Sequence, residues 1–472
     1  MATTMCASSI SARSTAIPAR RASVAPAGRV SVARAAISPL AVKRGLAPLS
    51  SRAAIAGRAI KGARSNGART FAVAVPAGAD QPGVEGIQFG GLQGKALNPP
   101  ATYPTRAEVF GAIPEDCYKR ETMTSMLYAV ISTVLTVGTG LLAYNFIPLT
   151  AAYIPAWIAY AAINGTIGTG MWVVAHECGH GAFSDNKFIQ DLVGYVMHTA
   201  LLVPYFSWQR SHAVHHSRTN HLTEGETHVP YQIGEMKGDK NLALKEAVGS
   251  APFAIINGIF HLVFGWPAYL LFGATGGPKY GVTNHLWPYA PFSGKLFPGG
   301  WKPKVIASAL GVAAMGAVLA KWAAIDGALK VFAVYFGPYI GVNFWLVLYT
   351  WLQHTDVDVP HYDGKDWDWV KGAFLTIDRP YGAVLDFLHH RIGSTHVAHH
   401  VAHTIPHYKA VKATNALKEA FPDLYLYDPT PIHVALWRVC SECVAIRPRG
   451  TDDGQWVFQS RKNIADVPSP AL

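Results

Sequence analysis

The apolar positions of this chain gather in long uninterrupted segments. Residues 122–175 contain no Asp, Glu, Lys or Arg, and this length is enough for two helices of about 20 residues that each cross a bilayer. A turn around Asn145 and Pro148 separates the two helices. The pattern therefore predicts a helical hairpin with spans at about 123–147 and 150–174.

A second pair of apolar segments covers residues 305–324 and 331–353. Segments 188–206 and 253–272 are also apolar but include polar residues, so they are expected to lie at the membrane interface or to re-enter. The chain is 50% apolar and only 15% charged, which is low for a soluble protein. We therefore predict an all-α membrane protein with about four transmembrane helices in two hairpins, joined to a helical cap.

The positive charge lies almost entirely at the N-terminus. Residues 1–79 contain 12 Lys and Arg and no acidic residue, which leaves 28 basic and 29 acidic residues in the remainder and removes the support for nucleic-acid binding. The Ala-, Ser- and Arg-rich composition of residues 1–75 is typical of an organelle transit peptide and favours the chloroplast over the mitochondrion, with a basic tail of other use as the alternative. A flexible linker at 76–105, a catalytic domain at 106–450 and a C-terminal tail at 451–472 are then expected.

Eight histidines lie in three short motifs, HECGH, HAVHH and HVAHH, each of which follows an apolar segment. Histidines spaced three or four residues apart on a helix project to one side and can reach one metal ion. Neutral imidazole favours zinc, copper, iron or nickel. Because eight ligands exceed what one tetrahedral zinc uses, two metal ions are predicted. The candidate ligands are His176, His180, His212, His215, His216, His396, His399 and His400.

The three motifs can form one site only if they lie on the same side of the membrane. The first motif follows the first hairpin and the third motif follows the second hairpin, so segments 188–206 and 253–272 should not cross the membrane singly. Basic residues gather on the same side, as the charge rule for membrane proteins requires. They are Lys119, Arg120, Arg210, Arg218, Lys302 and Lys304.

Two other functions would use the same residues. HECGH is also the HExxH pattern of zinc metalloproteases, in which His176 and His180 bind zinc and Glu177 is the general base, although both HxxHH motifs then have no role. A metal transporter or storage protein would place histidines at mid-membrane depth.

Oxidation of an unactivated methylene by O₂ suits iron with open coordination positions. A metal site at the membrane surface would lie where lipid acyl chains can reach it.

The motifs resemble those of the membrane fatty acid desaturases. The similarity runs from residues 106–121 to 424–438 and includes HECGHGAFSDNKFIQDLVG, LVPYFSWQRSHAVHHSRTNH, LYTWLQHTDVDVPHY and TIDRPYGAVLDFLHHRIGSTHVAHH. The resemblance implies a non-haem di-iron centre of two Fe ions held by the eight motif histidines, with His354 at the end of the last span as a further ligand. No ligand role is expected for six other histidines, His221, His228, His389, His390, His403 and His407.

The resemblance also implies the reaction. Two hydrogens are removed from a membrane glycerolipid acyl chain, and O₂ is reduced to water with electrons from a protein donor, which in a plastid would be ferredoxin. A related hydroxylase or epoxygenase would use the same ligands.

The residues within the histidine motifs bear on the position at which the double bond is introduced. HECGH and HVAHH are shared with the extraplastidic omega-6 subgroup, whereas many plastid omega-3 enzymes have Asp and Ile at the positions of Glu177 and Ala398. The N-terminal composition and VHHSRTNHLTEGETHVP resemble the green-algal chloroplast omega-3 subgroup. We therefore expect an omega-3 desaturase of the chloroplast envelope or thylakoid membrane that converts linoleate-type to alpha-linolenate-type chains, with an omega-6 (delta-12) desaturase as the alternative.

Overall fold

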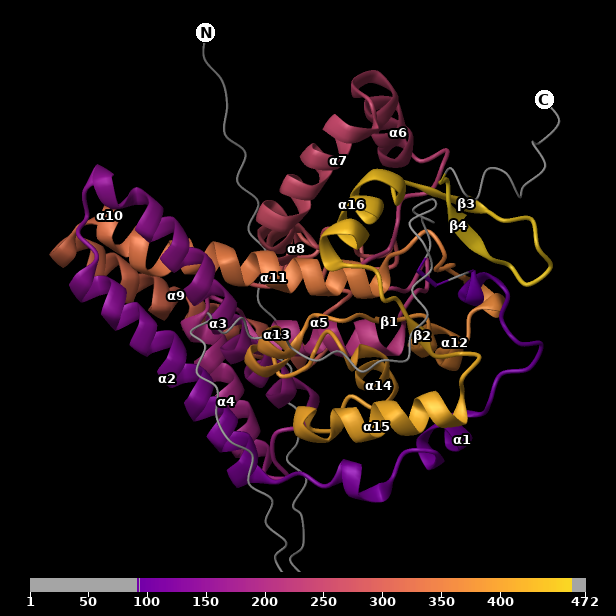
Figure 1. The fold of residues 1–472 in the computed structure, drawn as a ribbon, viewed down its shortest axis with the longest axis horizontal. Helices are drawn as coiled ribbons and strands as arrows, with labels where there is room; N and C mark the ends of the chain where they lie inside the picture. Colours follow the sequence, from indigo (N-terminus) through magenta and orange to yellow (C-terminus); the bar gives the residue numbers. More distant parts are fainter. Residues whose placement is uncertain (1–90, 93, 461–472) are drawn as a thin grey trace, which may run out of the picture. The chain divides into compact units, whose positions relative to one another are not determined.

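The computed structural model describes residues 91–92 and 94–460, and the predicted transit peptide at 1–75 lies outside the described residues. As predicted, the described part is mainly helical (Figure 1). Its long apolar helices are α2 (Thr122–Phe146), α3 (Ile154–His180), α9 (Trp301–Asp326) and α11 (Gly337–His354). The shorter helices are α1 (Arg106–Gly111), α4 (Lys187–Ala200), α5 (Tyr205–Ser217), α6 (Met236–Val248), α7 (Ser250–Ile259), α8 (Gly265–Phe272), α10 (Ala328–Val331), α12 (Trp369–Phe374), α13 (Ala383–Leu388), α14 (His396–Val401), α15 (His407–Ala420) and α16 (Ile432–Glu442).

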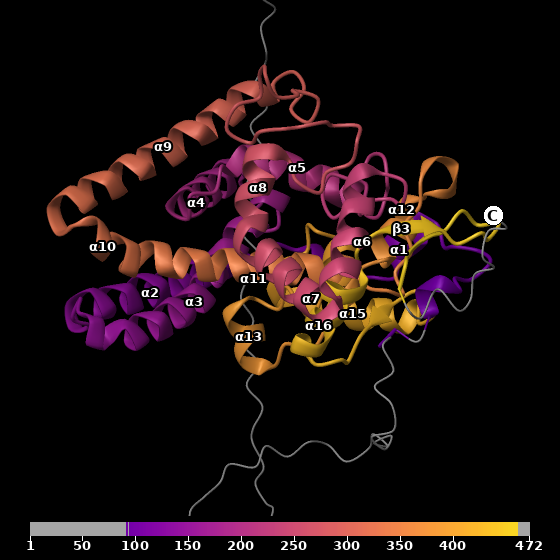
Figure 2. The same cartoon turned by 90° about the horizontal axis from the view of Figure 1, so that it is seen from above.

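Two short sheets complete the described part. The first pairs β1 (Ile377–Asp378) with β2 (Leu426–Tyr427) in parallel, and the second pairs β3 (Ile446–Pro448) with β4 (Trp456–Phe458) in antiparallel orientation. Both sheets lie on the side of the described part away from α9 and α10 (Figure 1), and Figure 2 shows β3 on that same side.

Five helical segments of the described part are long and apolar enough to cross a membrane. They are 122–146, 151–180, 250–272, 301–326 and 328–354. Four of them coincide with the predicted spans within a few residues, because long charge-free segments are a strong signal for such helices. The fifth contains α7 and α8 joined by a π-helical turn, η4 (Phe260–Phe264). The structure thus confirms a helical protein with several apolar helices, whereas the layout of four spans in two hairpins is not confirmed.

The contacts of the fifth helix bear on that layout. In α7, the Asn257 side chain donates a hydrogen bond to the Cys440 carbonyl of α16 (2.9 Å). In α8, the Tyr269 hydroxyl donates to Ser211 Oγ (2.7 Å), which directly precedes the second histidine motif. Both halves of this segment therefore contact short helices outside the four predicted spans.

Two of the long apolar helices, α3 and α11, are in close backbone contact. A Cβ atom on Gly165 of α3 would lie 2.7 Å from Gly341 Cα of α11, so the two helices meet through paired glycines, as membrane helices commonly do. At the far end, the Tyr144 hydroxyl of α2 donates to Asp326 of α9 (2.7 Å). The contact between Gly165 and Gly341 fixes the direction of α3 relative to α11, and both helices carry histidines at their C-terminal ends.

The folded part extends beyond the predicted boundaries of 106–450. In the described part of the predicted linker, Leu92 and Ala96 are buried against Tyr362 and Leu375. In the described part of the predicted tail, β4 pairs with β3. The apolar contacts of Leu92 and Ala96 were not predicted, because the few apolar residues of the Gly- and Pro-rich segment 76–105 show no periodicity.

Candidate metal centre

Four helices bring the candidate histidines to one place. The last turn of α3 carries the first motif, α5 carries the second, α14 carries the third, and α11 ends at His354. The α3 helix stops directly after His180 because Gly181 adopts a left-handed conformation (φ 79°), the usual way to terminate a helix. All nine predicted ligand residues lie in this region.

The first group contains five histidines whose ligand nitrogens all lie within 4.8 Å of one another. His176 Nε2 is 3.0 Å from His212 Nε2 and 3.2 Å from His180 Nε2. The members of this first group are His176, His180, His212, His216 and His399.

The second group contains His215, His354 and His400, again with ligand nitrogens within 4.8 Å of one another. His396 joins them, because its Nε2 lies 3.1 Å from His354 Nε2. His215 Nε2 also lies 3.1 Å from the same His354 Nε2 atom. Four imidazoles thus surround the second position.

Helix geometry explains why two groups form. Residues four apart on an α-helix differ by about 40° in direction, whereas adjacent residues differ by about 100°. In α5, His212 and His216 therefore face the first group and His215 faces the second. In α14 the arrangement is reversed, since His399 faces the first group while His400 faces the second with His396. An HxxHH motif is thus suited to serve two metal positions, and not one side only as the spacing suggested.

The protonation chemistry of the groups fits metal ions. Burial lowers the pKa of His215 and of His396 to about 3, so both imidazoles are neutral and offer a lone pair, as a metal ligand must. Each Nε2 atom carries either one proton or one lone pair. His176 Nε2 nevertheless faces two other Nε2 atoms, a conflict that a cation between the nitrogens removes.

Two further nitrogens support this interpretation. Within the part of the chain that the structure describes, the buried Nε2 atoms of His399 and His400 have no hydrogen-bond partner. Buried polar atoms are almost always paired, and a metal ion in each group would satisfy one of them. The residues therefore fit two metal ions, one in each group.

Neighbouring groups orient the ligands. Thr219 Oγ1 lies 3.1 Å from His400 Nδ1 and donates to the His215 carbonyl (2.8 Å). A ligand histidine whose second nitrogen is held in this way keeps its ring orientation. Thr219 was not predicted from the sequence as a functional residue. Its position four residues after His215 could have indicated a contact with the histidine motif.

Two histidines without a predicted ligand role also border the centre. The His403 ring lies 4.9 Å from the His180 ring, and the His228 ring stacks on His354 at 5.3 Å. His228 has a positive φ of 58°, which is uncommon for a non-glycine residue. Neither belongs to the two groups of mutually close nitrogens.

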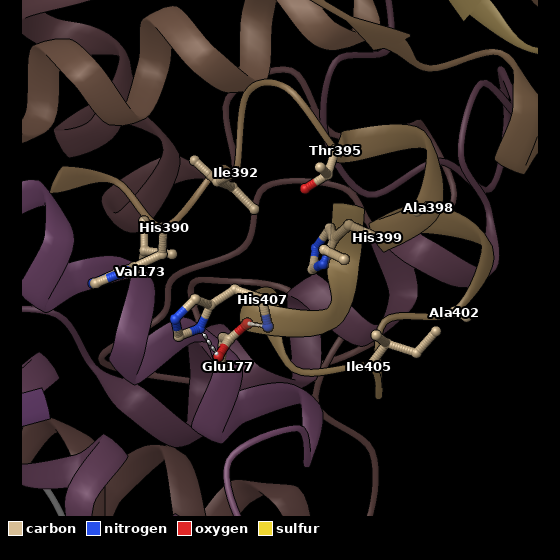
Figure 3. Close-up of a pocket in the computed structure, with 11 residues that line it drawn as sticks. Val173, Glu177, His390, Ile392, Thr395, Ala398, His399, Ala402, Ile405 and His407 are labelled. Carbon is tan, nitrogen blue, oxygen red and sulfur yellow. Dashed lines mark hydrogen bonds and ion pairs between the residues drawn. The ribbon is translucent and has the colours of Figure 1, made fainter. Parts of the chain in front are cut away.

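Glu177 belongs to neither histidine group, and its side chain is bound by His407. Its carboxylate accepts hydrogen bonds from the His407 backbone amide (2.7 Å) and lies 2.6 Å from His407 Nδ1 (Figure 3). The pair borders a small cavity that is also lined by His399 and Thr395. A metalloprotease needs this carboxylate beside a zinc-bound water, so the geometry removes the support for the protease interpretation.

We expect Glu177→Gln to retain the metal ions and to lower activity by no more than about tenfold, because glutamine still accepts the His407 amide hydrogen bond. The change can be measured as product formed per molecule of metal-loaded protein. A loss of about a thousandfold with the metal retained, typical of a removed general base, would contradict this assignment.

Comparison with known proteins identifies the family. Residues 152–430, more than half of the chain, match the family Fatty acid desaturase. A delta-12 acyl-lipid desaturase of Punica granatum is 39% identical over 365 residues, covering 76% of this chain and 91% of that protein. An omega-6 fatty acid desaturase of Glycine max, named as an endoplasmic reticulum isozyme, is 38% identical over 75% and 90% of the two chains. An oleoyl-12-hydroxylase of Ricinus communis is 37% identical over 77% and 92%.

These relatives correct the expected position of the double bond. The desaturases among them carry delta-12 or omega-6 names, so the expectation of an omega-3 enzyme is wrong. The wrong expectation rested on the composition of the N-terminus. This composition bears on delivery to an organelle and not on the position of the double bond in the acyl chain. The metal-binding motifs are also common to enzymes of different regiospecificity. With the matched region, the relatives and the apolar helices in agreement, the chain belongs to the membrane fatty acid desaturase family.

Proposed function

We propose that this protein is a delta-12 (omega-6) desaturase that converts an oleate-type acyl chain of a membrane glycerolipid to a linoleate-type chain, with two Fe ions as its metal cofactor. The observation that carries the proposal is the pair of adjacent histidine groups at the C-terminal ends of the apolar helices α3 and α11. The delta-12 position rests on relatives of that name, which match most of both chains.

The reaction balances as one CH₂–CH₂ unit, O₂, two electrons and two protons giving one CH=CH unit and two waters. Iron bound in both groups would supply the redox chemistry that removes hydrogen from an unactivated methylene with O₂. The chain holds neutral, buried imidazoles around both positions, and the apolar helices keep bulk water away from the acyl chain. Thr219 fixes the direction of the His400 ring.

The electrons must come from outside the described part of the chain. We propose ferredoxin as the donor and a chloroplast membrane as the location, because the acid-free, Arg-rich composition of residues 1–75 is typical of a transit peptide. A fluorescent fusion of the full chain tests the location. Fluorescence in the endoplasmic reticulum would exclude the chloroplast and, with it, ferredoxin.

The proposed reaction is tested by producing the full chain in a host that contains oleate but forms no linoleate, together with a ferredoxin and its reductase. Fatty acids are then separated by gas chromatography, and the double-bond position is mapped by mass spectrometry. We expect new linoleate, and none with His215→Ala. New 12-hydroxy acid would instead indicate a hydroxylase, the activity named for the Ricinus relative. No new product with an active donor present would contradict the proposal.

A further inference from the structure

Two adjacent residues, Asp378 and Arg379, contact two of the three elements that supply the second histidine group, α11 and α14. Asp378 ends strand β1, and both side chains are completely buried. Successive side chains of an extended segment point to opposite sides. The pair can therefore contact two different elements at once.

Asp378 contacts the third histidine motif. Its Oδ1 atom accepts a hydrogen bond from the Val397 backbone amide (2.9 Å), in the first turn of α14. Its Oδ2 atom accepts one from the Tyr425 hydroxyl. Thr395, at the start of α14, makes no capping hydrogen bond of its own, so Asp378 satisfies a helix-terminal amide that would otherwise lack a partner.

Arg379 contacts the end of α11 on both sides of His354. Its Nε atom donates to the Leu352 carbonyl (3.0 Å), and its Nη2 atom pairs with Asp356 (3.1 Å). The last carbonyls of a helix have no partner within the helix. Arg379 therefore fixes the last turn of α11, from which the His354 ring extends.

The charge of Arg379 is balanced within a closed cluster. Arg379 also pairs with Asp428, and Arg438 of α16 pairs with Asp356 and Asp428 at 2.6 Å each. Two arginines and two aspartates, all buried, leave no net charge. A cluster of this kind tolerates little displacement, because moving one member leaves a buried charge unpaired.

From these contacts we infer that Asp378 and Arg379 are positioning residues that set the distance between His354 and α14. They thereby complete the second histidine group, whose members His354 and His396 lie 3.1 Å apart although 41 residues separate them along the chain. The first group takes four of its five members from α3 and α5, whereas the hydrogen bonds and ion pairs of Asp378 and Arg379 described above go to other elements. The inference rests on the proposed two-metal centre but not on the delta-12 reaction.

The test uses purified full-length protein and a variant that keeps the cluster neutral, Arg379→Met combined with Asp428→Asn. Metal content per chain is measured for iron, zinc and manganese together with the rate at which a chelator extracts each ion. We expect one of the two ions to leave about 10- to 100-fold faster than in the wild type, the usual effect of removing a group that orients a ligand. The other ion should leave at the wild-type rate.

The matched control is Lys245→Met combined with Glu442→Gln, which removes a partly buried ion pair between α6 and α16 and likewise keeps the net charge unchanged. This control should release both ions at the wild-type rate. Unchanged extraction in the cluster variant, or equal acceleration of both ions, would overturn the inference.

If the double variant does not fold, Arg379→Lys decides by the same two rates, because lysine keeps the charge but cannot bind Leu352, Asp356 and Asp428 together. Product formation is recorded separately. A wild-type protein that holds two ions but makes no linoleate refutes the proposed function and leaves this inference standing.

Discussion

Replacing His354 by alanine is expected to abolish linoleate formation and to release one of the two metal ions. His354 Nε2 lies 3.1 Å from both His215 and His396, so it is the shared member of the second group. The loss should exceed the roughly 100-fold cost of removing a group that merely orients a ligand. The loss of activity is measured as the ratio of linoleate to oleate in the oleate-containing host, and the loss of metal as the metal content of the purified variant.

The control for this variant is His261→Ala. His261 lies in the fifth apolar helix, where its Nδ1 contacts the Asn257 carbonyl (2.9 Å), and it belongs to neither histidine group. The control should keep both metal ions and most of its activity. Retention of more than a tenth of wild-type activity by His354→Ala would show that His354 is not a ligand.

Replacing Gly165 by leucine is expected to disrupt the α3–α11 pair. A Cβ atom at this position would lie 2.7 Å from Gly341 Cα and 2.8 Å from the Pro338 carbonyl, and backbone atoms cannot rotate away as a side chain can. Overpacking of this kind costs about 1–3 kcal/mol even where side chains adjust. We expect a lower melting temperature in detergent and a lower yield of folded protein.

Gly316→Leu is the matched control, because a Cβ atom on Gly316 in α9 would meet nothing within 4 Å. Both substitutions add the same side chain to a long apolar helix. Equal melting temperatures for the two variants would contradict the close contact between α3 and α11.

The sequence was sufficient for the features that depend on local composition. Four apolar helices coincide with the predicted apolar segments, and the eight motif histidines were found by their spacing. The division into two groups was not predicted, because it depends on how α5 and α14 face each other across the centre. His354 was assigned through family resemblance alone, since a single histidine at a helix end carries no spacing signal.

Long-range contacts account for the remaining features. Asp378 and Arg379 are separated from His354 by more than 20 residues, and nothing local distinguishes them from other charged residues. Glu177 lies in a motif that fits two kinds of enzyme, and only its contact with His407 shows which way it points. The position of the double bond in the acyl chain was not predicted correctly, because the histidine ligands bind metal in the same way whichever methylene is oxidised.

We propose that nine histidines hold two iron ions in separate groups. Anomalous X-ray scattering from crystals of the purified protein, recorded above and below the iron absorption edge, locates the bound iron. We predict two iron peaks, one among His176, His180, His212, His216 and His399 and one among His215, His354, His396 and His400. A single peak, or peaks that appear only at the zinc edge, would contradict the proposal.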